Sequence, residues 1–182
     1  MPVRVADVSL ALAAAVLEPA QADRYRAFLD EAGEAALHRD GGREHVTASC
    51  FVFSPGFDRV LLCLHRKGGF WVQFGGHLES IDAALADAAL REAREESGVE
   101  AIALLSTQPV DLDRHELSAG FGWCAAHWDV GFAAVVAPDA VPTASDESDD
   151  VAWFDVDAVP AAVPTGFVVR LRNVLDLVRR LG

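Results

Sequence analysis

The chain has 182 residues, of which 52% are hydrophobic and 24% charged, and its formal net charge is −13. This composition predicts one globular domain with a sizeable core and excludes a disordered chain. The acidic balance argues against a nucleic-acid partner, which needs a basic surface, but it allows a small anionic substrate whose charge is screened by a metal cation.

The first part of the chain has the composition of helices. Alanine and leucine dominate residues 7–17, and Pro19 suits the first turn of a second helix that ends at Gly41-Gly42. The first apolar run is too short to span a membrane, and although it follows Arg4 and loosely resembles a secretory signal, its basic start is weak. We therefore expect residues 1–42 to form a helical extension of a cytoplasmic protein without a membrane partner.

The middle of the chain changes to β-branched and aromatic residues. "HVTASCFVF" and "RVLLCLHR" flank the turn residues "SPGFD", which predicts a hairpin. Further strands are expected in "FWVQF", "EAIALLSTQPV", "HWDVGFAAVVA" and "VAWFDV", with "PTASDESDD" as an acidic loop. An amphipathic helix, "GFVVRLRNVLDLVRRL", closes the chain, and the pattern predicts a mixed sheet covered by helices.

The cysteines do not have the pattern of a disulfide framework or of a zinc ribbon. Cys50, Cys63 and Cys124 form no CxxC pair, and their number is odd. We expect buried free thiols in a reducing compartment.

One helix carries its charges in an unusual place. "REAREESG" belongs to a helix expected over residues 82–97 and stopped by Gly98. At about 100° per residue, Glu92 and Glu96 each fall about 20° from Leu85, on the side that an amphipathic helix normally keeps apolar. A salt-bridged surface helix is the alternative, but its glutamates would lie opposite the leucine.

A divalent metal would explain two carboxylates on the buried side. Burying like charges costs several kcal/mol, roughly, unless something positive pairs with them. Magnesium takes one or two carboxylates together with substrate phosphates and water. Arg91 could hold a carboxylate in place, and Gly75-Gly76 would let the backbone approach the ion closely.

These residues resemble the signature of the Nudix hydrolases. That signature is a Gly, five residues, a Glu, seven residues, then Arg-Glu-hydrophobic-x-Glu-Glu-x-Gly-hydrophobic, and "REAREESGV" (91–99) fits its second half. The first half departs, because Gly76 lies one residue further from Arg91 than usual, in a "GGH" form. The expected Glu falls on Ala83, and the neighbouring Asp82 is interpreted as the N-cap of the helix.

The resemblance implies an α/β/α sandwich with a mixed β-sheet in residues 43–182. It also implies metal-dependent cleavage of the diphosphate linkage of a nucleoside diphosphate derivative. Mg²⁺, with Mn²⁺ as an alternative, would bind Glu92, Glu96, Glu95 and the Gly76 carbonyl. Glu95 would serve as third ligand or activate water, and Arg91 would orient the glutamates.

Other residues are candidates for the base and for substrate contacts. Glu147, in the late acidic loop, is a candidate general base, although a solvated loop is the simpler interpretation. Arg66, Trp71 and His77 are candidates for binding the small phosphorylated substrate, with turn and core roles as alternatives. His115 and His127 are weaker candidates for a base or phosphate contact.

Two other functions stay open at this point. A non-catalytic Nudix-fold module would bind a nucleotide and regulate a partner, which the altered first half of the signature allows. An isomerase of the isopentenyl diphosphate type would need a catalytic cysteine near the pocket, whereas Cys63 lies inside the apolar run "VLLCL". The substrate is not specified, and a homodimer is neither predicted nor excluded.

Overall fold

The computed structural model describes residues 1–117, 123–146 and 148–181. Its helices are α1 (Val5–Ala14), α2 (Pro19–Ala32), the 3₁₀ helix η1 (Gly33–Leu37), α3 (Leu85–Ser97) and α4 (Phe167–Leu181). Its strands are β1 (Glu44–Phe53), β2 (Arg59–His65), β3 (Phe70–Val72), β4 (Phe74–His77), β5 (Ala103–Leu104), β6 (Asp111–Glu116), β7 (Ala126–Val135) and β8 (Ser148–Asp155).

The strands form one mixed sheet. Its order is β3-β2-β1-β7-β5, with β4 also paired to β1, β6 to β7 and β8 to β2. The long pair β1–β7 is parallel, and the other pairs are antiparallel. The predicted hairpin is confirmed, because Val52 faces Leu61 and Phe53 faces Val60 across β1 and β2. The predicted mixed sheet is confirmed as well.

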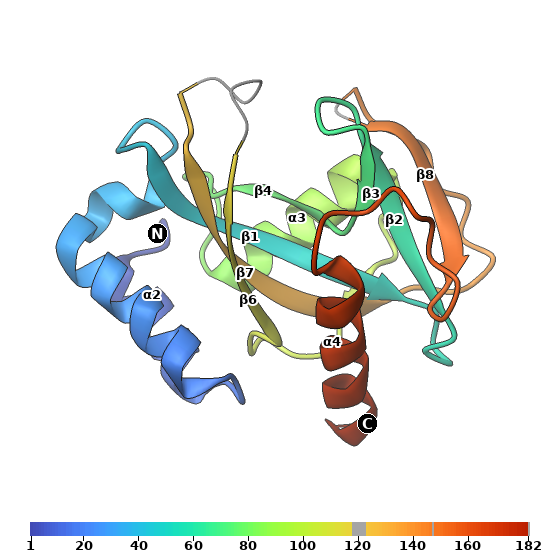
Figure 1. Ribbon diagram of the computed structural model, residues 1–182, viewed down its shortest axis with the longest axis horizontal. Coiled ribbons are helices and arrows are strands. Elements are labelled where there is room, and N and C mark those ends of the chain that lie inside the picture. The colour runs from blue at the N-terminus through green and yellow to red at the C-terminus, as the bar shows by residue number, and fades with distance from the viewer. Residues whose placement is uncertain (118–122, 147, 182) are drawn as a thin grey trace.

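Strand β1 separates two hydrophobic cores. Its even-numbered residues from Val46 to Val52 pack with α1, α2 and α3, whereas Phe51 and Phe53 pack with α4. This division follows from the two-residue period of a strand. We call the two sides of the sheet the α3 face and the α4 face, and Figure 1 shows α3 behind the sheet and α4 in front of it. The predicted α/β/α architecture is confirmed.

The N-terminal helices belong to the same core. Val8, Leu12 and Leu29 are buried together with residues of β1 and α3. The Tyr25 hydroxyl donates a buried hydrogen bond of 2.6 Å to the Asp129 carbonyl of β7. None of the helices within the described residues combines the length and apolar character that a membrane crossing demands.

Some elements differ from the sequence-based expectation. Strand β6 was not predicted, because its α4-facing residues are polar and bind α4 rather than packing as apolar side chains. Of the expected strand "EAIALLSTQPV", only the two-residue β5 forms. Gly75, Gly76 and His77 lie in β4 rather than in a loop, paired with β1.

Candidate active site

Helix α3 turns two glutamates toward the sheet, as the periodicity predicts. Glu96 is only 5% exposed, and the Glu92 side chain is 15% exposed. The Glu95 side chain is 61% exposed, and Asp87 points to solvent on the other side. Gly98 ends the helix in the left-handed conformation expected of a glycine C-cap, and its N–H donates to the Arg94 carbonyl at 2.8 Å.

Two glycines of β4 let the backbone approach these carboxylates. A Cβ on Gly76 would lie 2.6 Å from Glu92 Oε1, so a side chain there would have to push the carboxylate aside. The N–H of Gly75 donates a 2.9 Å hydrogen bond to Glu96 Oε2. A Cβ on Gly75 would itself meet the backbone of β1 at 2.8 Å. Both glycines are therefore needed for this contact between strand and helix.

Arg91 connects the parts of this site. Its NH1 donates to Glu92 Oε1 at 2.9 Å and to Glu95 Oε2 at 3.1 Å, and its NH2 donates to the His77 carbonyl at 3.0 Å. Burial lowers the pKa of this guanidinium, but hydrogen bonding to Asp82 and the charge of Glu92 outweigh it and raise the pKa above its ordinary value. The fixed charge of Arg91 thus holds two carboxylates and the end of β4 together.

Asp82 is not the N-cap of α3. Ala84 occupies that position, without a side-chain hydrogen bond. Asp82 is buried and binds Arg91 through two hydrogen bonds of 3.1 and 3.0 Å, and it also accepts the Glu79 N–H at 2.7 Å. The N-cap interpretation was therefore wrong. Counted forward from Gly76, Asp82 occupies the position of the signature Glu, so the extra residue lies between it and Arg91.

These donors fit a hard divalent cation. Glu92 and Glu96 bring carboxylate oxygens to the same short strand, where the glycine backbone leaves no side chain in between. Carboxylates are the ligands that magnesium prefers. Arg91 donates a hydrogen bond to Glu92 and fixes its orientation, as residues that hydrogen-bond to metal ligands commonly do.

Two of the predicted substrate residues, Arg66 and Trp71, contact β8. Arg66 binds the start of β8, with Nε 2.8 Å from Asp149 Oδ1 and NH1 bonded to the Asp146 carbonyl. The Trp71 ring packs edge-on against Phe154 with centroids 4.7 Å apart. Glu147 lies outside the described residues.

Cys63 lies within β2 and is 1% exposed. Burial and the nearby Glu96 carboxylate raise the pKa of its thiol above the ordinary range. Since the thiolate is the reactive form, this environment disfavours the nucleophile that the isomerase alternative requires.

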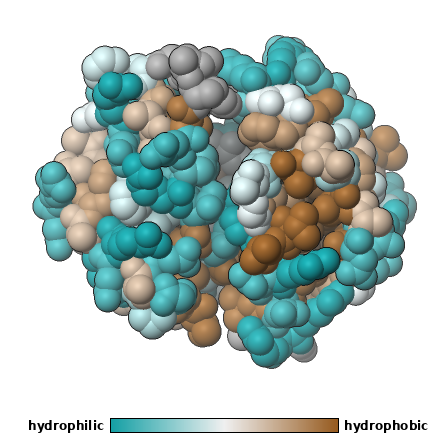
Figure 2. All heavy atoms as spheres, viewed as in Figure 1, coloured by the Kyte–Doolittle hydropathy of each residue, from teal (hydrophilic) through white to brown (hydrophobic). Residues whose placement is uncertain are grey.

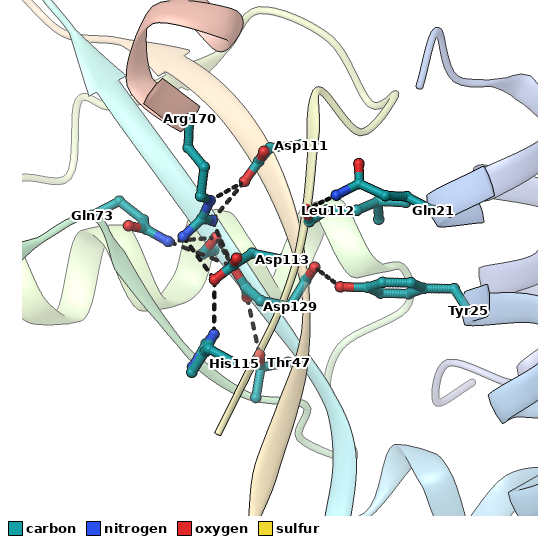
Figure 3. A network of polar contacts seen from close by, with 11 residues as sticks. Gln21, Tyr25, Thr47, Gln73, Asp111, Leu112, Asp113, His115, Asp129 and Arg170 are labelled. Carbon is teal, nitrogen blue, oxygen red and sulfur yellow. Dashed lines mark hydrogen bonds and ion pairs between the residues drawn. The ribbon is translucent and has the colours of Figure 1, made fainter. Parts of the chain in front are cut away.

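The α4 face carries a polar network that the sequence did not reveal. Arg170 of α4 reaches across the sheet to Asp111 at 2.8 Å, Asp113 at 2.9 Å and Asp129 at 3.6 Å (Figure 3). Asp129 accepts hydrogen bonds from Thr47 and Ser49 of β1. The sequence signal was the alternation of "DLDRH", which places three polar side chains on one face of a strand.

Figure 2 shows hydrophobic side chains gathered over the start of α4 and the segment before it. Hydrophilic side chains lie below this patch and to its right.

Comparisons with known proteins agree with this geometry. The NUDIX domain family model matches residues 43–178, most of the chain. The chain belongs to the Nudix family. The predicted family is thus confirmed, and the match spans the strands and the helix α3 described above. Among curated proteins, none matches this chain.

Several solved structures share this Nudix fold. A NUDIX-family hydrolase from Clostridium perfringens has 24% identity and a TM-score of 0.59, covering 73% of this chain and 97% of its own. An Ap4A hydrolase from C. elegans has 16% identity and a TM-score of 0.61, with 74% and 98% covered. The NUDIX domain of Shewanella oneidensis NrtR, solved with ADP ribose, has 17% identity and a TM-score of 0.55, with 75% and 88% covered. These likenesses show that the chain shares the fold of the three proteins.

Proposed function

We propose that this protein is a metal-dependent pyrophosphohydrolase that cleaves the diphosphate linkage of a nucleoside diphosphate derivative. The observation that carries the proposal is the convergence of Glu92 and Glu96 on the glycines of β4, held by Arg91. Family membership and the two similar structures named as hydrolases support it.

Each residue of the site has a defined task in this proposal. Glu92 and Glu96 would hold Mg²⁺ or Mn²⁺, with the Gly76 carbonyl as a further ligand. A divalent ion bound there supplies charge neutralisation for the diphosphate and lowers the pKa of an attacking water. Arg91 keeps Glu92 and Glu95 in place, so that no reorganisation is needed when the substrate binds.

Glu95 is the residue of this helix best placed to move a proton. Its side chain is mostly exposed, and Arg91 NH1 holds its Oε2 at 3.1 Å. An exposed carboxylate with one fixed oxygen can accept a proton from water on its other oxygen. Glu147 is retained as the second candidate for the general base.

The test is phosphate release from a panel of nucleoside diphosphate derivatives with a coupled phosphatase. The panel holds nucleoside triphosphates, sugar nucleotides, dinucleoside polyphosphates and dinucleotide cofactors, each with and without Mg²⁺. We expect turnover of at least one member that requires Mg²⁺ and disappears in Glu96→Gln. Asp87→Asn is the matched control, since it changes an exposed carboxylate of the same helix.

A second candidate function is a nucleotide-binding regulatory module without turnover. The extra residue between Asp82 and Arg91 favours it, because that residue alters the loop that leads into α3. Calorimetric binding of panel members that are never hydrolysed would support this function and overturn the hydrolase.

A further inference from the structure

Four side chains with the chemistry of zinc ligands meet on the α4 face of the sheet. Their donor atoms all lie within 4.8 Å of one another, and we call them the histidine–cysteine cluster: His45, His77, Cys124 and His127. His45 and Cys124 are buried, and the other two are half-buried. The cluster shares only His77 with the site on the α3 face, where the carbonyl of His77, and not its side chain, accepts a hydrogen bond from Arg91.

The strand pairing brings these residues together from distant parts of the sequence. His45 of β1 and His127 of β7 are direct partners in the parallel pair. His77, the last residue of β4, pairs with Thr47 of β1, two residues along the strand from His45. Cys124 precedes β7 and lies three residues before His127, a spacing typical of paired zinc ligands.

The rings contact one another closely. The centroid of His45 is 4.8 Å from that of His77 and 4.9 Å from that of His127. The Nε2 atoms of His45 and His77 are 2.9 Å apart, so one of them donates to the other. His127 Nε2 is buried and, within the described residues, has no hydrogen-bond partner. A buried polar atom without a partner requires an explanation, and a bound ion is one of those that native proteins use.

Burial of the three rings disfavours their charged form. Burial lowers the pKa of His77 to about 4 and that of His127 to about 3, and the neighbouring histidines and Arg39 add to both shifts. Burial also lowers the pKa of His45. The neutral imidazole is the form that coordinates a metal ion, so burial acts in the direction that favours coordination.

We propose that the histidine–cysteine cluster binds one Zn²⁺ ion as a closed structural site. Three imidazoles and a thiolate form a donor set that zinc prefers and magnesium does not. Around a tetrahedral zinc ion such donors lie about 3.3–3.8 Å apart, so the four need to close by only about 1 Å. On binding, the Cys124 thiol releases its proton to solvent, and its sulfur forms the bond to the metal.

The ion would join three strands at one end of the sheet. It would connect β4 to β1 and β7 and fix the segment before β7 at Cys124. His77 follows Gly76 directly in β4. The zinc site would therefore hold β4 in place from the α4 face, while the backbone of the same strand contacts Glu92 on the α3 face. This role does not depend on the proposed hydrolase activity.

The test begins with the metal content of the full-length, tag-free protein, measured by inductively coupled plasma mass spectrometry. We expect about one zinc per chain, retained in Glu96→Gln and lost in Cys124→Ala and His127→Gln. Cys50→Ala and His38→Gln are the matched controls, since neither residue belongs to the cluster.

Cobalt substitution of the wild-type protein gives a second readout that does not depend on a variant folding. We expect the intense visible bands of tetrahedral Co²⁺ and a near-ultraviolet thiolate-to-cobalt band, the latter absent from Cys124→Ala and present in Cys50→Ala. A protein that neither contains zinc nor gives the thiolate band would overturn the proposal. So would a different metal that is present in place of zinc and is lost in Cys124→Ala, or zinc that persists in a folded Cys124→Ala.

Discussion

The two faces of β4 carry opposite kinds of donor, although Gly76 and His77 are neighbours in the chain. On the α3 face, Gly76 meets the carboxylate of Glu92, and the surrounding groups are oxygen atoms held by an arginine. On the α4 face, His77 meets imidazoles and a thiol. Hard oxygen donors suit magnesium, and nitrogen and sulfur donors suit zinc. One short strand can therefore support two sites that do not compete for the same ion.

The largest expected effect is a loss of hydrolase activity when the α3 face is changed and the α4 face is left intact. Glu96→Gln removes a metal-binding oxygen from the α3 face, which we expect to cost several kcal/mol of transition-state stabilisation, about a thousandfold in kcat. Steady-state kinetics at saturating Mg²⁺ measure it, and the zinc content should stay unchanged. Full activity in Glu96→Gln would contradict the role of Glu96 in binding the metal ion. Asp87→Asn should behave as wild type.

The next effect concerns stability on the α3 face. Arg91→Ala leaves Asp82, which is 3% exposed, without its guanidinium partner. Breaking a buried pair in this way destabilises a protein by about 3–5 kcal/mol. Urea unfolding should show this loss, and adding Asp82→Asn to the variant should recover part of it. A loss below about 1 kcal/mol would mean that the pair behaves like an exposed one.

Zinc removal should act on stability more than on chemistry. For a ligand at 100 times its Kd the stabilisation is about 2.7 kcal/mol, which in a domain of this size shifts Tm by roughly 5–10 °C. We expect this lower Tm in Cys124→Ala and in wild-type protein treated with a zinc chelator. Calorimetry should show recovery of the chelated protein with Zn²⁺ and not with Mg²⁺. Recovery of Tm with Mg²⁺ would contradict the prediction, because it would assign the stabilisation to the carboxylates of the α3 face.

The smallest expected effect tests how closely β4 must approach α3. In Gly76→Ala the new Cβ would lie 2.6 Å from Glu92 Oε1 and push the carboxylate aside. Because a carboxylate is the flexible end of a side chain, we expect a loss of only about tenfold in kcat, typical of a displaced supporting group. Gly42→Ala is the control, since its Cβ would find only ordinary contacts. Unchanged kinetics in Gly76→Ala would show that Glu92 tolerates the shift.

Local patterns account for what could be predicted. The helix α3 and its end at Gly98 followed from periodicity and a glycine stop, and the burial of Glu96 followed from its angle relative to Leu85. The β1–β2 hairpin followed from strand composition on both sides of a turn. Apolar alternation does not predict strand β6, because its side chains that face α4 include Asp111 and Asp113, which pair with Arg170.

The sequence by itself determined the family, the mixed sheet and the charged face of α3, because each depends on residues close together in the chain. Tertiary structure decided the contacts between residues that are far apart in the chain or whose partners local spacing does not indicate. It paired Asp82 with Arg91, where the sequence had suggested an N-cap. It also placed His45 beside His127, and His77 beside both, because strand register joins residues that no local spacing connects.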